Sequence, residues 1–190
     1  MKICLMFLVV LMLLLNTHSL FAQDNEKEFQ RIGKMNIREL TPVAKAALEK
    51  KYPNEKWEKY NFPKYAYIND SVLVGYKIAI KEPQLLAKFP CYCFCDVTMS
   101  HRNLSYCYLA KGTLLGGLDP HGAECTICNG QAMMAFLWQE LGIDVPKMQA
   151  AISDRVDSGP GRSALPVGRE TASLTGTEPC TPSADGLHLP

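Results

Sequence analysis

The chain contains 190 residues, of which 20 are lysine or arginine and 19 are aspartate or glutamate, so its formal net charge is +1 at pH 7. This balance gives no electrostatic reason to expect binding to nucleic acid or to an anionic membrane surface. The length fits one modest domain once the two atypical ends of the chain are set aside.

The N-terminal end has the pattern of a secretory signal peptide. Lys2 precedes an apolar run over residues 3–15, and a short polar stretch then leads to Ala22. This pattern predicts cleavage after Ala22, and the apolar run is shorter than the roughly 20 residues that a membrane-spanning helix needs. We therefore expect an exported protein, periplasmic or extracellular, whose mature chain has no stable membrane span.

A linker over residues 23–40 is expected to precede the folded domain, which we place at residues 41–157. Thr41-Pro42 combines an N-cap residue with a proline at the first helical position. Apolar residues then recur at helical spacing until Pro53. These signals predict a short helix that begins at Thr41.

In the middle of the domain, the sequence pattern does not favour a single type of secondary structure. The aromatic-rich segment 57–67 contains a proline and is expected to be irregular or extended and to pack on the core. Ser71 can cap a helix that runs to Ile80, although the β-branched residues of this segment would equally suit a strand. Another short helix is predicted over residues 82–86, and it ends before Pro90 because the residue that precedes a proline avoids the helical region.

The last third of the domain is predicted to be helical. A turn is expected at residues 119–122, whose sequence is Asp-Pro-His-Gly. The segment from Cys125 to Leu141 carries apolar residues at helical spacing, with Gly142 as its C-cap. A final short helix is predicted over residues 145–156. The predicted fold class is therefore mainly α: a small helical domain with a Cys/His-rich loop region.

Residues 158–190 differ in composition from the rest of the chain. They contain no aromatic residue and are rich in Gly, Pro, Ser and Thr. Little apolar surface is thus available to offset the entropy cost of ordering the chain. This tail is predicted to be disordered.

Six cysteines and two histidines lie in one block of the chain, which we take as the functional region. Thiol and imidazole side chains concentrated in this way are typical ligands for soft or borderline metals. A Cys-x-x-Cys pair at the start of a helix is further predisposed to bind metal, because the helix N-terminus favours thiolate over thiol. The predicted metal ligands are Cys91, Cys93, Cys95, His101, Cys107, His121, Cys125 and Cys128.

Copper or zinc is the expected ion. Zinc accepts four sulfurs, or three sulfurs and one nitrogen, in a tetrahedral arrangement. Copper(I) is favoured by several thiolates close together. An iron–sulfur cluster also takes four cysteines but suits an exported protein less well. The expected role is sequestration, transfer or sensing of the metal, and a metal-handling protein is the partner that such a role implies.

Two other interpretations of the cysteines remain open. The six could form three disulfides in an oxidising compartment, giving a structural or interaction domain without metal. Alternate residues of an extended strand lie about 7 Å apart, at or beyond the usual separation for a disulfide, so each member of the Cys-x-Cys-x-Cys triplet would pair with one of the three later cysteines.

The second interpretation is a thiol–disulfide redox pair formed by Cys125 and Cys128. The β-α-β surroundings of a thioredoxin-like motif are not evident in the sequence. No residue is assigned a catalytic role, and a binding protein is expected rather than an enzyme.

The sequence Pro-Cys-Tyr-Cys-Phe-Cys over residues 90–95, with the ordered His and Cys pattern that follows over residues 101–128, resembles the bacterial PCYCGC-motif family. The resemblance spans roughly residues 75–155. It implies an exported protein, often a lipoprotein in the family, and it implies no activity because the function of the family is uncharacterised. Phe94 stands where the family has glycine, and the leader lacks the cysteine that carries the lipid.

Overall fold

The computed structural model describes residues 23–93 and 99–157. These residues form α-helices and short 3₁₀ turns, and the described ranges contain no named strand. Leu109 and Leu118 form an isolated antiparallel bridge. The predicted mainly α class is confirmed. The predicted signal peptide, Cys95 and the predicted disordered tail lie outside the described residues.

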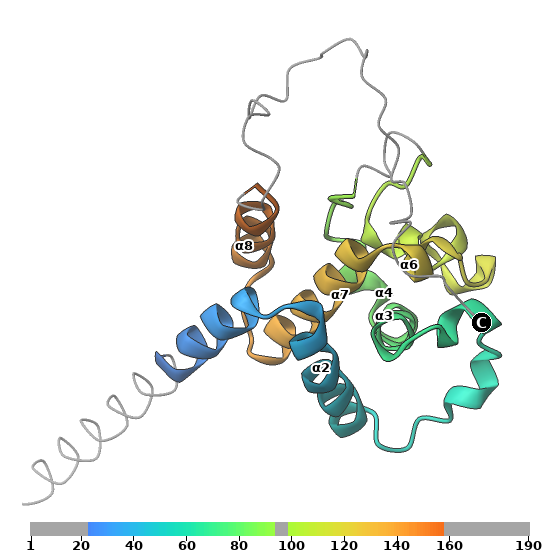
Figure 1. The fold of residues 1–190 in the computed structure, drawn as a ribbon, viewed down its shortest axis with the longest axis horizontal. Helices are drawn as coiled ribbons and strands as arrows, with labels where there is room; N and C mark the ends of the chain where they lie inside the picture. The colour runs from blue at the N-terminus through green and yellow to red at the C-terminus, as the bar shows by residue number, and fades with distance from the viewer. Residues whose placement is uncertain (1–22, 94–98, 158–190) are drawn as a thin grey trace, which may run out of the picture.

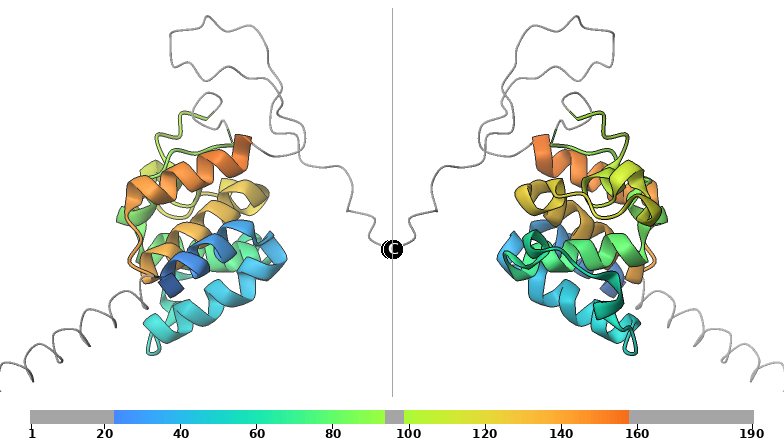
Figure 2. Two further views of the ribbon diagram at one scale, coloured as in Figure 1. Left: turned by 90° about the vertical axis from the view of Figure 1, so that its left-hand side faces the viewer. Right: turned by 90° about the vertical axis from the view of Figure 1, so that its right-hand side faces the viewer.

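Helix α7 (Thr126–Glu140) lies at the centre of the fold. Helices α2 (Ile37–Lys51) and α3 (Asp70–Lys81) both pack against it and against each other. The one-turn helix α4 (Pro83–Leu86) and the final helix α8 (Val145–Asp157) also contact α7 (Figures 1 and 2). Most of α7 is buried, as its apolar sequence predicts for a helix covered on several sides.

Helix α2 begins earlier than predicted, at Ile37 instead of Thr41. The Asn36 side chain accepts hydrogen bonds from the backbone N–H groups of Arg38 and Glu39, and the Glu39 carboxylate accepts one from the Asn36 N–H, at 2.9, 3.2 and 2.8 Å. This capping box satisfies the free donors of the first turn. Pro42 is therefore inside the helix, where a proline removes one backbone hydrogen bond. The burial of apolar residues such as Leu40 offsets the resulting loss of stability.

Residues 23–40, which were predicted to form a linker, contribute to the core. Residues 23–34 are helical, and Phe29 and Ile32 are buried. The indole Nε1 of Trp138 donates a hydrogen bond to the carbonyl oxygen of Phe29 at 3.0 Å, and the two rings lie 4.8 Å apart. This contact fixes the segment against the C-terminal half of α7.

The segment 71–80 is helical and not a strand. Asn69 caps α3 by accepting a hydrogen bond from the Val72 N–H at 3.0 Å. Both alternating and consecutive residues of α3 are buried, because the helix lies between α2, α7 and α6. Tertiary packing thus overrides the strand preference of the β-branched side chains. The preceding aromatic segment forms two 3₁₀ turns, η1 (Trp57–Tyr60) and η2 (Lys64–Tyr67).

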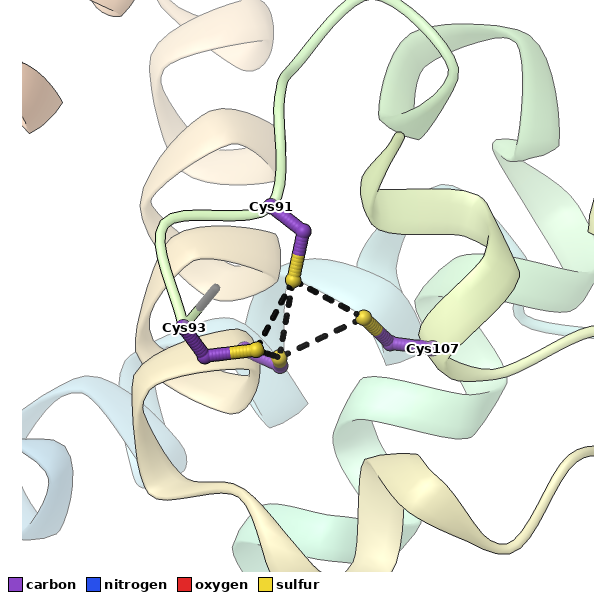
Figure 3. Close-up of side chains that lie close together, drawn as sticks. Cys91, Cys93 and Cys107 are labelled. Atoms are coloured by element: carbon purple, nitrogen blue, oxygen red, sulfur yellow. Dashed lines mark hydrogen bonds between the residues drawn. The ribbon is translucent and has the colours of Figure 1, made fainter. Parts of the chain in front are cut away.

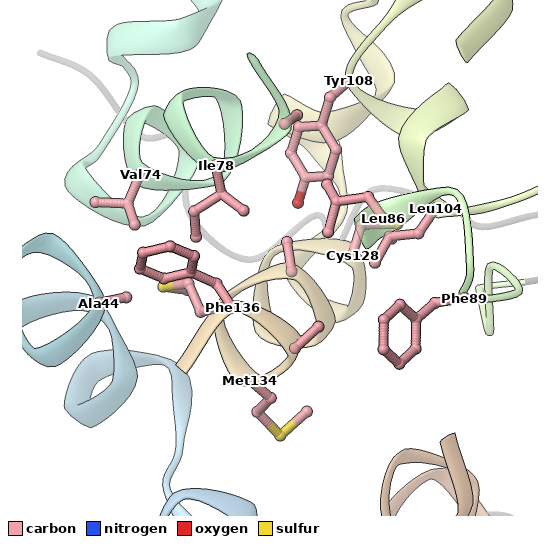
Figure 4. Close-up of a cluster of buried hydrophobic side chains, with 14 of the residues drawn as sticks. Ala44, Val74, Ile78, Leu86, Phe89, Leu104, Tyr108, Cys128, Met134 and Phe136 are labelled. Carbon is pink, nitrogen blue, oxygen red and sulfur yellow. The ribbon is translucent and has the colours of Figure 1, made fainter. Parts of the chain in front are cut away.

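The Cys/His-rich region is built from short elements that cover one end of α7. After α4 come η3 (Leu104–Cys107), η4 (Ala110–Gly112), η5 (Leu114–Gly116) and α6 (His121–Glu124). The buried core continues into this region, and Figure 4 shows Cys128 among apolar side chains that include Leu86, Leu104 and Tyr108.

Within residues 23–93 and 99–157, no helix is long and apolar enough to cross a bilayer.

Candidate metal centre

Four cysteines from three separate segments meet beside the first turn of α7. Cys91 and Cys93 follow α4, Cys107 ends η3, and Cys128 lies in α7. Cys93, Cys107 and Cys128 are at most 1% exposed, and Cys91 is 7% exposed. The fold thus removes all four sulfurs from bulk water.

The four sulfurs are close together. The Cys91 Sγ lies 3.0 Å from that of Cys93, 3.1 Å from that of Cys107 and 3.6 Å from that of Cys128. The Cys128 Sγ lies 3.5 Å from that of Cys93 and 3.4 Å from that of Cys107. Figure 3 shows the sulfurs of the three labelled cysteines pointing toward one another. Sulfurs bound to a tetrahedral zinc ion at about 2.3 Å lie about 3.8 Å apart, so small outward movements would admit an ion.

The oxidation states of these cysteines differ. Cys91, Cys107, Cys125 and Cys128 are free thiols, whereas Cys93 is disulfide-bonded. The three-disulfide interpretation required all three later cysteines to be paired, and in the structure they are not. Cys93 can contribute a thiolate ligand only after its disulfide is reduced.

Two histidines stand at the edge of the sulfur group. The Cys93 Sγ lies 3.7 Å from the His121 Nε2, and the Cys107 Sγ lies 3.7 Å from the His101 Nδ1. The two imidazole rings are 5.2 Å apart and nearly perpendicular, and both residues are 7% exposed. His101, Cys107 and His121 therefore form a second set of possible ligands within 4.8 Å of one another.

Cys125 has a different position from Cys128. It is the N-cap of α7, and its sulfur accepts a hydrogen bond from the Cys128 N–H at 3.5 Å. It joins Cys93, His121 and Cys128 in a third possible ligand set. The four-sulfur group thus includes Cys128 of the Cys-x-x-Cys pair, whereas Cys125 lies outside it.

The cysteines of the four-sulfur group differ in the direction in which their pKa values are shifted. Hydrogen bonds from the Cys107 and Cys128 thiols lower the pKa of Cys91 to about 3, although burial acts in the opposite direction. For Cys107, the hydrogen bond with Cys128 lowers the pKa, but the hydrogen bond to Cys91 and burial outweigh it and raise the pKa overall. The pKa of Cys128 is raised mainly by its hydrogen bond with Cys107. The group therefore favours one thiolate stabilised by two thiols.

The pKa values of Cys125 and His101, which flank the four-sulfur group, are also shifted. The hydrogen bond from the Cys128 thiol, assisted by backbone N–H groups at the start of α7, lowers the pKa of Cys125 to about 7. Burial, followed by the proximity of His121, lowers the pKa of His101. Its imidazole is thus held in the neutral form, which is the form that binds metal.

Polar residues behind the cysteines fix their positions. The Tyr108 hydroxyl donates to the Asn129 Oδ1 at 2.9 Å, and the Asn129 Nδ2 donates to the Gly122 carbonyl oxygen at 3.0 Å. Tyr108 follows Cys107, and Asn129 follows Cys128, so these bonds tie together the elements that carry the two sulfurs. Sequence reasoning did not identify these residues, although a lone Asn inside an apolar helix was an available signal.

Comparison with known proteins identifies the family. The sequence profile of the family described as "Protein of unknown function with PCYCGC motif" matches residues 54–166. No curated protein and no solved structure matches the chain. The matched range includes all six clustered cysteines and both histidines, and it covers more than half of the 190 residues. The chain therefore belongs to the PCYCGC-motif family, as the resemblance in its cysteine pattern implied.

Proposed function

We propose that this protein is an exported metal-binding protein that holds copper(I) or zinc through Cys91, Cys93, Cys107 and Cys128. The observation that carries the proposal is the convergence of four buried sulfurs, from three segments, to within 3.6 Å of Cys91. The leader pattern over residues 1–22 supports export. Sequestration, transfer or sensing of the ion are the roles that suit such a site.

The protonation of the sulfur group also supports a cation ligand. The groups that lower the pKa of Cys91 are two thiols, a backbone hydrogen bond and His121. A buried thiolate needs compensation for the water that it loses, and a metal ion supplies it more fully than neutral thiols do. An ordinary buried cysteine, by contrast, behaves as a small apolar residue and gains nothing from several sulfur neighbours.

The oxidation state of Cys93 bears on the choice of ion. The free thiols of Cys91, Cys107 and Cys128 offer three soft ligands, which suit copper(I). Reduction of Cys93 adds a fourth sulfur and completes the tetrahedral set that zinc prefers. His101 and His121 stand close enough to replace one of the sulfurs.

Metal titration of the purified protein tests the proposal. After anaerobic reduction and removal of the reductant, we expect one tightly bound equivalent of copper(I) or zinc at pH 7 in competition with a chromophoric chelator. Without reduction, zinc affinity is expected to fall on the order of 10-fold or more, because Cys93 is not a thiolate. A reduced protein that is folded by circular dichroism and binds neither ion would contradict the proposal.

Metal affinity is expected to fall as the pH is lowered. Binding must displace the protons of Cys107 and Cys128, whose pKa values are raised, so each proton competes with the ion over the whole range below those values. The pKa of Cys91 is lowered by its hydrogen bonds with the Cys107 and Cys128 thiols, so protonation of Cys91 competes with the ion less than protonation of those two cysteines does. Chelator competition between pH 8 and pH 5 measures the effect, and an affinity independent of pH would exclude thiol ligands.

A further inference from the structure

Two buried histidines that are not members of the four-sulfur group lie beside Cys107. His101, Cys107 and His121 each offer one ligand atom, and these three atoms lie within 4.8 Å of one another. The Cys107 Sγ lies 3.7 Å from the His101 Nδ1, whereas a sulfur and a nitrogen bound to one tetrahedral zinc ion lie about 3.6 Å apart. This pair of atoms already has the spacing that a shared ion requires.

Close packing of α6 on η3 places His121 beside Cys107. His121 begins α6, and its backbone N–H donates a hydrogen bond to the Asp119 carboxylate at 2.9 Å. The next residue is Gly122, at which a Cβ atom would lie 2.9 Å from the Cys107 carbonyl oxygen. Glycine therefore allows the two backbones to approach, and this approach sets the position of the His121 imidazole.

The mixed set of ligands differs chemically from the four-sulfur group. Two imidazoles and one thiolate suit a borderline divalent ion such as zinc, whereas copper(I) prefers the sulfur-rich group. Three protein ligands leave one of the four tetrahedral positions to water. His101 and His121 are each 7% exposed and Cys107 is fully buried, so the histidine side of the set is the side that solvent can reach. The disulfide-bonded Cys93 is not a member of this set.

We propose that His101, Cys107 and His121 bind a second ion, zinc(II), beside the ion of the four-sulfur group, with water in the fourth position. The inference deepens the proposed function and rests on it, because the Cys107 thiolate belongs to both sets and bridges the two ions. The second ion has one protein ligand fewer and shares a sulfur with the first, so it is held less tightly. The one tight equivalent expected above is therefore the ion of the four-sulfur group.

Cobalt(II) tests the second site, because it replaces zinc and is visible by absorption. After reduction and removal of the reductant, the full chain is loaded anaerobically with one equivalent of copper(I), which is colourless and occupies the sulfur-rich group. Titration with cobalt(II) is then expected to saturate at one further equivalent and to be reversed by zinc. The spectrum is expected to show the d–d bands of four-coordinate cobalt and a sulfur-to-cobalt charge-transfer band.

The same titration separates the second site from the proposed function. A protein that holds copper(I) but develops no cobalt bands would overturn the second site and leave the proposed function intact. A protein that takes up neither copper(I) nor zinc would overturn both.

His101→Phe distinguishes the two sites within the protein, because it keeps a ring and removes the ligand nitrogen. It is expected to weaken cobalt binding on the order of 10-fold or more and to leave the copper(I) affinity unchanged. Tyr106→Phe is the matched control. The Tyr106 ring lies 6.2 Å from that of His101, but Tyr106 is in none of the ligand sets of the described residues, so cobalt binding is expected to be unchanged.

Unchanged cobalt binding in His101→Phe, or an equal loss of copper(I) affinity, would overturn the proposal. A loss of cobalt binding in Cys125→Ser would also overturn it, because the ion would then be held by the set of Cys93, His121, Cys125 and Cys128. His121→Phe changes a different element, is expected to give the same loss of cobalt binding as His101→Phe, and replaces that variant if it does not fold.

Discussion

Cys128→Ser is expected to lower the affinity of the reduced protein for copper(I) or zinc on the order of 100-fold or more. The Cys128 sulfur lies within 3.6 Å of those of Cys91, Cys93 and Cys107 and is completely buried. A serine hydroxyl at this position is a much poorer ligand for a soft ion than a thiolate. Competition with a chromophoric chelator measures the loss.

Cys125→Ser is the matched control for this prediction, because it changes the same atom one helical turn away. Serine is a favoured N-cap residue, so α7 is expected to keep its first turn. The four-sulfur group is untouched, and metal affinity is expected to change less than 10-fold. If Cys125→Ser weakens binding as much as Cys128→Ser does, the ion is held by the set that includes Cys125 and His121 instead.

Gly75→Ala is expected to lower the free energy of unfolding by about 2–4 kcal/mol. A Cβ atom at Gly75 would lie 2.5 Å from the Asn129 Oδ1 and 2.9 Å from a Tyr108 ring carbon. Both groups belong to the buried hydrogen bond that supports Cys107 and Cys128, and they cannot move without breaking it. Urea unfolding of the reduced, metal-free protein measures the change.

Gly130→Ala provides the comparison on the facing helix. A Cβ atom there meets nothing within 4 Å, so the variant gains helix propensity without a clash. We expect it to be neutral or more stable by up to about 1 kcal/mol. If the two variants have the same stability, the close approach of α3 to α7 at Gly75 does not constrain the fold.

Local signals predicted the helices whose ends are marked in the sequence. The range of α7 was predicted from apolar spacing and from Gly142, whose positive φ of 74° suits a residue that follows a helix. The start of α2 was wrong because Thr41-Pro42 is a local signal, whereas the capping box at Asn36 is reinforced by packing. The strand alternative for α3 failed for a similar reason, since burial on several sides removes the contrast between helical and alternating patterns.

The sequence predicted which residue types could bind a metal, but not which of these residues the fold brings together. Composition alone identifies the cysteines and histidines as a set. The place of Cys107 in the four-sulfur group depends on how η3 packs against α7, and no local pattern encodes that contact. The same holds for Tyr108 and Asn129, whose hydrogen bond joins residues 21 positions apart in the chain.

The three-segment origin of the sulfurs constrains when an ion can be bound. Cys91 and Cys128 are 37 positions apart, which corresponds to roughly 120 Å in an extended chain, whereas their sulfurs lie 3.6 Å apart in the fold. A chain threaded through a narrow translocation pore cannot hold an ion between them. Under the proposed function, an exported protein would therefore bind its ion only after η3 has docked on α7, and the bound ion would then stabilise the fold against proteolysis between these cysteines.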